Sequence, residues 1–347
     1  MSLGATLVAS FLVALARPTT WPLALATFLL RGGIVLVLAP IVVIPSAVGL
    51  ANVIGPMLTS FVFGGMSTAL IVAVAAAIAA FGCWIVIGGF VAAAAEAEAI
   101  VIVATDEEVA GSVGISPVLA SERALVDRAR SATAWRVLAV RLVAHLPLIL
   151  ALAWGAFRIV SVTYHELTLP SDVDSPLIVR VVRGAPDAVA LLVASWIVGE
   201  ALGALATRRV VQAGDGVARA LGGGLGWLVR HPVRTAVVTL LPLAALLAVV
   251  VPSAAAAAAS WEALRTSLAT GQGFVPTFLL LALFIVLWAG GLLLLAVIGS
   301  WRAAAWTVEM AGTFGGVRPD RPGGWNADDE SGTLTDLRPR GVDPDPR

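Results

Sequence analysis

The chain has 347 residues, 59% of them hydrophobic and 13% charged, with a mean hydropathy of +0.96. Soluble domains carry about 25% charged residues, so this composition excludes an ordinary water-soluble fold and indicates a protein that is solvated by lipid. The 22 basic and 22 acidic residues cancel, and a chain without net charge gives no reason to expect a nucleic-acid partner.

Two residue counts narrow the class further. All 22 basic residues are arginine, which we interpret, together with the abundance of Ala, Val, Leu and Gly, as the codon bias of a GC-rich bacterial genome. The single cysteine, Cys83, excludes a disulfide framework and a zinc site built from cysteines. We interpret Cys83 as a small buried hydrophobic residue.

In chain order, the first predicted element is a short helix over residues 2–17 that lies on the membrane surface. Its apolar residues follow helical spacing on one face, and its hydroxyl residues form the opposite stripe. The apolar face comprises Leu3, Leu7, Phe11 and Leu15, and the polar stripe comprises Ser2, Thr6 and Ser10.

Six apolar segments follow, each long enough to cross a hydrocarbon core, which needs about 20 helical residues. Pro40 and Pro45 predict a kink in the first segment. The sequence therefore predicts an all-α integral membrane protein with six transmembrane helices, paired as three hairpins. The predicted spans are 22–50, 67–103, 132–163, 185–207, 233–258 and 275–307.

The distribution of arginine predicts the orientation. Fourteen arginines lie at the N-terminus, in loop 104–131, in the 208–234 junction and in the C-terminal tail. The opposite loops hold three, which are Arg180, Arg183 and Arg265. Because cytoplasmic loops are enriched in basic residues, we expect a multi-pass protein of the bacterial cell membrane with both termini in the cytoplasm.

A threefold pattern runs through the chain. Each predicted hairpin follows an amphipathic lead-in helix, the second of which is expected to start at Ser116–Pro117, and each following span has an early proline: Pro22, Pro147 and Pro232. The pattern predicts a membrane domain over 1–310 with pseudo-repeats of about 1–103, 104–207 and 208–310. Each repeat would hold an interfacial helix and a hairpin. The tail over 311–347, rich in Pro, Gly and Asp, is predicted to be disordered.

The segment "WLVRHPVRTAVVTLL", which starts at Trp227, is interpreted as the junction between a lead-in helix and a span. Tryptophan prefers the headgroup level, arginine reaches phosphates, and proline is tolerated in the first helical turn. His231 is interpreted as interfacial rather than as a ligand. The predicted interfacial anchors are Trp21, Trp135, Trp227, Arg230, His231 and Arg234.

This junction, together with even-numbered spans in which a glycine precedes small residues (Gly89, Gly199 and Gly299), resembles the membrane domain of bacterial glycerophosphodiester phosphodiesterases. It is similar also to related stand-alone polytopic membrane proteins of bacteria. The resemblance covers about residues 1–310 and implies a fold and a membrane location. The catalytic domain of that family has no counterpart in this chain, so the resemblance implies no catalytic residue.

Ionisable residues inside the predicted spans are the candidate functional residues, since a charge at mid-bilayer costs at least about 2.5–3.5 kcal/mol. At 1.5 Å per residue they lie about 9 to 15 Å inside the spans. A shared depth predicts one polar cluster, in which two arginines nearly neutralise three glutamates. The predicted members are Arg31, Glu96, Glu98, Arg141, His145 and Glu200, and Arg302 is a further candidate.

Two interpretations of this cluster stay open: structural ion pairs between hairpins, or a polar cavity for an ion, a proton or a lipid headgroup. The spacing Gly199-x-x-x-Gly203 would let another helix approach beside Glu200. The loop that holds His165, Glu166, Asp172 and Asp174 is interpreted as a solvated acidic loop rather than a cation site.

The sequence shows no HExxH motif, Walker A motif, dinucleotide fingerprint or Gly-x-Ser-x-Gly elbow. We therefore expect a protein that is not an enzyme and has no cofactor or metal, acting as an accessory or scaffold subunit or as a lipid-binding module. The alternative is a transporter or lipid-handling permease that uses the polar cluster. The expected partners are membrane lipids and a possible protein partner or second copy of the chain.

Overall fold

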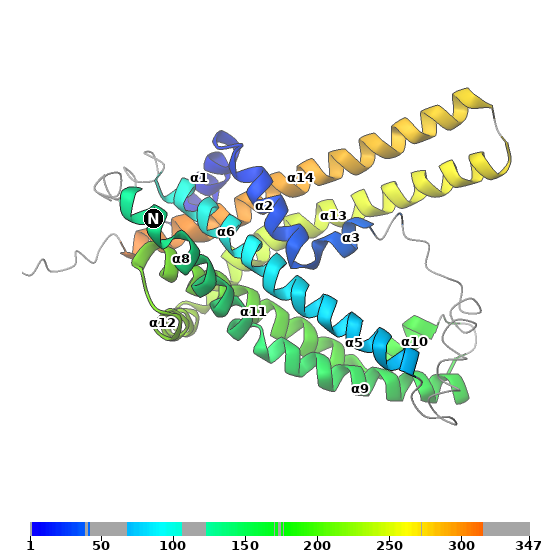
Figure 1. Cartoon of the computed structure of the whole chain (residues 1–347), viewed down its shortest axis with the longest axis horizontal. Helices are drawn as coiled ribbons and strands as arrows, with labels where there is room; N and C mark the ends of the chain where they lie inside the picture. The colour runs from blue at the N-terminus through cyan, green and yellow to red at the C-terminus, as the bar shows by residue number, and fades with distance from the viewer. Residues whose placement is uncertain are drawn as a thin grey trace, which may run out of the picture.

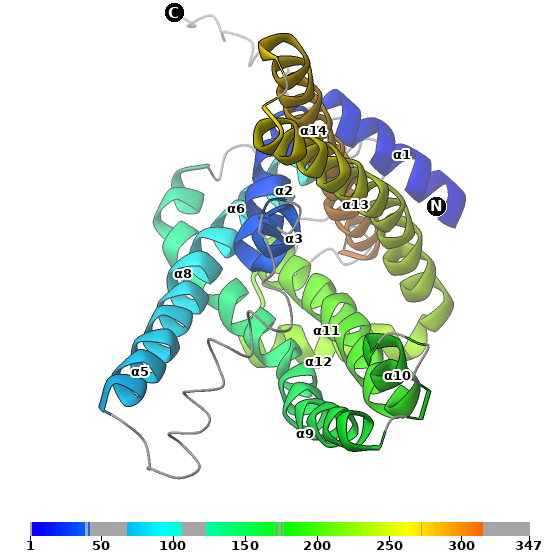
Figure 2. The same cartoon turned by 90° about the vertical axis from the view of Figure 1, so that its right-hand side faces the viewer.

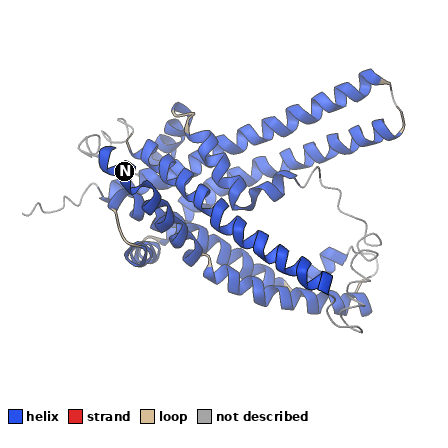
Figure 3. Ribbon diagram, viewed as in Figure 1, coloured by secondary structure: helices blue, strands red, loops and turns tan. Residues whose placement is uncertain are grey.

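The computed structural model describes residues 2–38, 41, 68–105, 123–169, 171–172, 175, 177–271 and 273–314. All regular structure in these ranges is helical (Figure 3). The elements are α1 (Leu3–Ala16), α2 (Thr20–Phe28), the π-helical η1 (Leu29–Gly33), α3 (Ile34–Leu38), α5 (Thr68–Cys83), the π-helical η3 (Trp84–Gly88), α6 (Gly89–Ala104), α8 (Arg123–Ala144), α9 (Leu146–Thr168), α10 (Leu177–Gly184), α11 (Pro186–Ala213), α12 (Val217–Arg230), α13 (Pro232–Ala269) and α14 (Phe274–Phe314).

Within the described residues, six helical segments are long and apolar enough to cross a membrane, so the chain is a multi-pass integral membrane protein. They are Thr20–Leu38, Ile71–Ala104, Leu146–Thr168, Pro186–Ala213, Pro232–Ala269 and Phe274–Ala311. The expectation of six apolar helices is confirmed.

The predicted start of the third span at residue 132 is wrong. Helix α8 ends at Ala144, and a new helix begins at Leu146 after His145 leaves the helical conformation (φ −96°, ψ 3°). The reason is Pro147, which lies in the first turn of α9, where its missing N–H costs no hydrogen bond. Arg141 and His145 consequently precede the third span rather than lying inside it.

The helices converge at one end of the molecule and diverge at the other (Figure 1). Helices α13 and α14 pack side by side, as do α9 and α11, and α2 and α6. Seen from the divergent end, α13 with α14, α5, and α9 with α10 point in three directions around α3 (Figure 2). Of the shorter helices, α1 packs on α14 and α12 packs on α11. Helix α8 packs on both α6 and α11. The buried core therefore lies at the convergent end.

Helix α1 turns its polar stripe toward the protein. Thr6 and Ser10 are buried, and both hydroxyls donate to backbone carbonyls of their own helix. Phe11 and Leu15 remain exposed. Because hydroxyls can be satisfied internally while the apolar side chains face outward, the helix presents an apolar surface to its surroundings, as a lipid-contacting helix would.

Cys83 is exposed, so its interpretation as a buried residue is wrong. It ends α5, whose described side chains are exposed on every side, for example Val72, Ile78 and Phe81. A helix that is apolar all round is stable only when lipid or another protein surface covers it. The exposure of Cys83 follows from this outward position of α5.

The first span is broken at the level of the candidate cluster. Arg31 adopts φ −87° and ψ 15°, and Gly32 adopts φ 103° and ψ −6°, so α2 and α3 are separate helices joined by η1. A positive φ of this size is unstrained only for glycine. This break, rather than a proline, bends the described part of the first span; Pro40 and Pro45 lie outside the described residues.

Substitution of Gly32 by alanine is expected to destabilise the protein by about 1–3 kcal/mol, because the positive φ would strain a residue with a Cβ. Gly82→Ala is the control, since Gly82 is helical and a Cβ there would meet no atom within 4 Å. Thermal denaturation in the same detergent compares the two variants. Equal midpoints would contradict a required positive φ at Gly32.

Several other predictions fall outside the described residues. These are the start of the second lead-in at Ser116–Pro117, Asp174 of the acidic loop, and the tail beyond residue 314. Helix α14 itself continues to Phe314, past the predicted domain end at 310.

Candidate functional site

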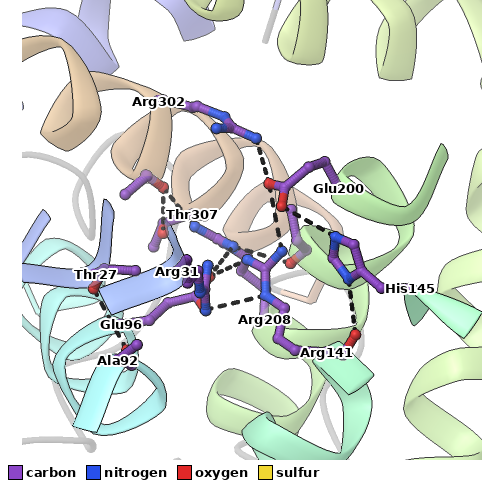
Figure 4. Close-up of polar contacts among 12 residues, drawn as sticks. Thr27, Arg31, Ala92, Glu96, Arg141, His145, Glu200, Arg208, Arg302 and Thr307 are labelled. Atoms are coloured by element: carbon purple, nitrogen blue, oxygen red, sulfur yellow. Dashed lines mark hydrogen bonds and ion pairs between the residues drawn. The ribbon is translucent and has the colours of Figure 1, made fainter. Parts of the chain in front are cut away.

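A cavity of about 400 Å³ lies where α2, α6, α8, α11, α13 and α14 meet. Its charged lining consists of Arg31, Glu96, Arg141, Glu200, Arg208 and Arg302 (Figure 4). These six residues come from five structural elements, which are η1, α6, α8, α11 and α14, and α11 contributes two of them. The fold therefore collects charges that are up to 271 positions apart in the chain, between Arg31 and Arg302.

Glu96 is the centre of the first half of the cluster. Three guanidinium groups, from Arg31, Arg141 and Arg208, donate to its carboxylate. The Arg141 Nε–Oε2 distance is 3.2 Å and the Arg208 Nη1–Oε1 distance is 3.1 Å. Each carboxylate oxygen accepts two hydrogen bonds, so the acceptor capacity of Glu96 is filled. At 5% side-chain exposure, Glu96 is shielded from solvent, which strengthens these contacts.

Glu200 is the centre of the second half. Arg302 Nη2 donates to its Oε2 at 2.5 Å, and Arg141 Nη1 lies 3.7 Å from the same oxygen. His145 Nε2 lies 3.2 Å from Oε1, while His145 Nδ1 lies 2.8 Å from the carbonyl oxygen of Arg141. A carbonyl only accepts, so Nδ1 donates to it. An imidazolium would donate both to the Arg141 carbonyl oxygen and to Glu200 Oε1, whereas a neutral ring would donate only to the carbonyl oxygen.

The charge balance differs from the prediction. Four arginines and two glutamates line the cavity, which gives a net charge of +2 for the described charged lining residues even with His145 neutral. The expectation that two arginines nearly neutralise three glutamates is therefore wrong. Glu98 does not line the cavity, because two residues along a helix rotate the side chain by about 200°, away from the face of Glu96.

Arg208 was placed by the sequence in the cytoplasmic junction, but α11 continues to Ala213 and buries Arg208 to 2% exposure. It donates also to the carbonyl oxygens of Ala204 and Ala303. The helical spacing of Glu200, Ala204 and Arg208 at i, i+4 and i+8 was the signal that would have placed Arg208 on the cavity face.

The two glycines of α11 admit α8 at close range, as the spacing predicted. A Cβ at Gly199 would lie 3.1 Å from the carbonyl oxygen of Ala144. A Cβ at Gly203 would lie 2.8 Å from Arg141 Nη1. These glycines therefore leave the space in which Arg141 and His145 reach the glutamates.

The cavity is amphipathic. Besides the charged residues, its walls are formed by apolar side chains that include Trp196 of α11 and Leu243, Leu246 and Val250 of α13. A small apolar recess of about 30 Å³ shares Phe28, Leu36 and Val250 with the cavity and is lined also by residues of α13 and α14, among them Trp288 and Gly291. The charged cavity thus adjoins a small apolar hollow.

The predicted anchors lie around the convergent end, apart from the cavity lining. Trp227 stacks on His231 with ring centroids 4.0 Å apart, and Arg230 is exposed. Arg234 Nε lies 3.0 Å from Oε1 of Glu309 on α14, a partner that the sequence did not indicate.

The other two predicted tryptophans each make a described contact. Trp21 Nε1 donates to the carbonyl oxygen of Ala14 at 2.8 Å. Trp135 is 51% exposed and packs against Phe90. Since α8 runs on to Ala144, Trp135 lies nine residues before the end of its helix.

Glu166, which the sequence predicts to lie in a solvated acidic loop, lies instead in the last turn of α9 and is buried. It accepts hydrogen bonds from the backbone N–H and the hydroxyl of Ser171. Its Oε2 also lies 3.1 Å from Arg180 Nε. Within the described ranges, no group of three or more His, Cys, Asp or Glu side chains is placed to hold a metal ion.

Comparison of the chain with protein-family models, with curated proteins and with solved structures found no match.

Proposed function

We propose that the protein is a lipid-binding membrane module, without catalytic activity, that holds the headgroup of a membrane lipid in the charged cavity. One observation carries this proposal: the cavity combines a buried charged side with apolar walls that lead into an apolar recess. Its volume of about 400 Å³ lies within the usual range of ligand pockets. Ion pairs that served only to join helices would not require an open space of this size.

The membrane setting of the proposal follows from the sequence. Because the arginine-rich segments are expected in the cytoplasm, the proposal puts the convergent end, and with it the cavity, on the cytoplasmic side of a bacterial cell membrane. Helices α1, α8 and α12 would then lie at that interface, each leading into a pair of spans. The resemblance to phosphodiesterase membrane domains agrees with this layout but assigns no ligand.

The test is retention of lipid by a protein whose cavity is filled. Ala303 lines the cavity from α14, so Ala303→Phe should displace a bound lipid without changing any charge. Leu293→Phe, at an exposed position of the same helix, is the control. We expect wild type and control purified in mild detergent to retain lipid at about one molecule per chain in native mass spectrometry, and Ala303→Phe to retain little. Equal retention by all three proteins would refute the proposal.

A lipid-handling permease is the second candidate, and the broken first span favours it. Discontinuous helices at mid-membrane sites are typical of transporters, and the break at Arg31–Gly32 adjoins the cavity. In liposomes, lipid transfer that falls in Arg141→Gln and Glu200→Gln would support this candidate. If lipid transfer were unchanged in both variants, a role for the charged cluster in transport would be excluded.

A further inference from the structure

We infer that the ligand of the charged cavity is an acidic amphiphile, whose headgroup bears a phosphate without a compensating ammonium group. This inference rests on the proposed lipid binding and adds the charge class of the lipid. It is carried by three observations: the net charge of the lining, the hydrogen-bond donors that remain available, and the small number of acceptors.

The first observation is the charge excess. Among the described lining residues, four guanidinium groups face two carboxylates. Uncompensated charge is costly in a setting of low dielectric constant, and it is stabilised when an opposite charge binds. An anion of charge −1 to −2 would reduce or cancel the excess, whereas a cation or a neutral polar group would leave it in place.

The second observation is the supply of donors. Each guanidinium group has five N–H donors, but within the described part of the chain Arg31 and Arg302 each make one hydrogen bond, to Glu96 and Glu200 respectively. Their side chains are 27% and 23% exposed, more than those of Arg141 and Arg208. In addition, Arg141 Nη1 is buried and lacks a hydrogen-bond partner. Phosphate oxygens suit such forked donors.

The third observation concerns the carboxylates. A zwitterionic headgroup would bring an ammonium group that needs an acceptor, yet Glu96 accepts four hydrogen bonds and is 5% exposed. Glu200 is 16% exposed and is already shared by His145, Arg141 and Arg302. The lining therefore has many donors to spare and few acceptors, all of them on a carboxylate that already faces cationic groups, which favours an acidic headgroup over a zwitterionic one.

The lipid origin of the phosphate follows from the neighbouring recess. Phe28, Leu36 and Val250 line both the charged cavity and the apolar recess, so the apolar part of a ligand whose headgroup lies at Arg31 would meet apolar side chains of α2, α3 and α13. A free phosphate ion would leave these apolar walls of the cavity without a contact. The geometry thus points to an amphiphile rather than to a soluble anion.

The experiment measures lipid selectivity of the full chain. Protein in mixed nanodiscs of phosphatidylglycerol and phosphatidylethanolamine with matched acyl chains is extracted into detergent, and the retained lipid is quantified by mass spectrometry. We expect wild type to retain the acidic lipid at least about tenfold in excess, and Arg31→Gln with Arg302→Gln to lower this ratio about 10- to 100-fold. Arg219→Gln, an exposed arginine on α12, controls for surface charge and should not change it.

A variant that removes a negative charge instead of a positive one separates the effect of charge on lipid retention from an effect on folding. Glu200→Gln raises the net charge of the lining by one, so retention of the acidic lipid should rise rather than fall, with circular dichroism showing that each variant keeps its helix content. Equal retention of both lipids that is insensitive to the arginine variants would overturn the inference while leaving lipid binding intact. Retention of no lipid would overturn both. Inorganic phosphate that binds alone and displaces no lipid would identify a soluble anion as the ligand instead.

Discussion

Glu96→Gln is expected to be the most destabilising single substitution at the cavity, by about 3–5 kcal/mol, since it removes the carboxylate that three buried or half-buried guanidinium groups share. The amide is nearly isosteric, so packing is preserved and the effect reports charge. Its NH₂ group would also face donors where an acceptor is required. The midpoint of thermal denaturation in mild detergent measures the loss.

The matched control is Glu98→Gln, two residues along the same helix. Glu98 is half-buried and does not line the cavity, so its neutralisation should lower the midpoint far less. If both variants lowered the midpoint equally, Glu96 would not be the centre of the cluster. A midpoint of Glu96→Gln that is restored by Arg31→Gln would show that charge repulsion between the guanidinium groups is the cause.

Gly203→Ala should destabilise the protein although alanine is the better helix former. The new Cβ would lie 2.8 Å from Nη1 and 3.1 Å from Cδ of Arg141. Arg141 cannot move freely, because its Nε and Nη2 are held by Glu96. Overpacking of this kind costs about 1–3 kcal/mol, and it should also lower lipid retention by shifting Arg141 within the cavity.

Gly226→Ala on α12 supplies the comparison, since a Cβ there would meet no atom within 4 Å. Replacing a glycine by alanine in a helix, where the new Cβ meets no neighbour, stabilises the helix by up to about 1 kcal/mol. The two substitutions are therefore expected to change the denaturation midpoint in opposite directions. A Gly203→Ala protein as stable as Gly226→Ala would show that α8 does not depend on the close approach to α11.

The start of the third span shows how far pattern alone can predict a boundary. Apolar residues lie on both sides of His145, so the sequence predicts one continuous helix across α8 and α9. The sequence contains Pro147 early in this segment, but only the backbone shows that α8 ends before it. Proline after the first turn bends or ends a helix depending on its neighbours, and composition does not distinguish the two.

The sequence by itself determined the membrane class, the six apolar segments and most of the charged residues that lie deep within them. These are properties of local composition and of segment length, and a bilayer imposes both on any chain that crosses it. The uneven distribution of arginine between the loops and the absence of known catalytic motifs are likewise read directly from the order of residues.

Only the tertiary structure decided which charges meet. Glu98 and Glu96 are neighbours in sequence but lie on different faces of α6, while Arg208 and Arg302 reach the cavity from α11 and α14. Depth along a span is a one-dimensional quantity, whereas an ion pair also depends on the rotation of each helix and on the space between helices. Gly199 and Gly203 allow the close approach of α8 to α11, and the presence of Arg208 and Arg302 in the lining, without Glu98, gives the cavity an excess of positive charge.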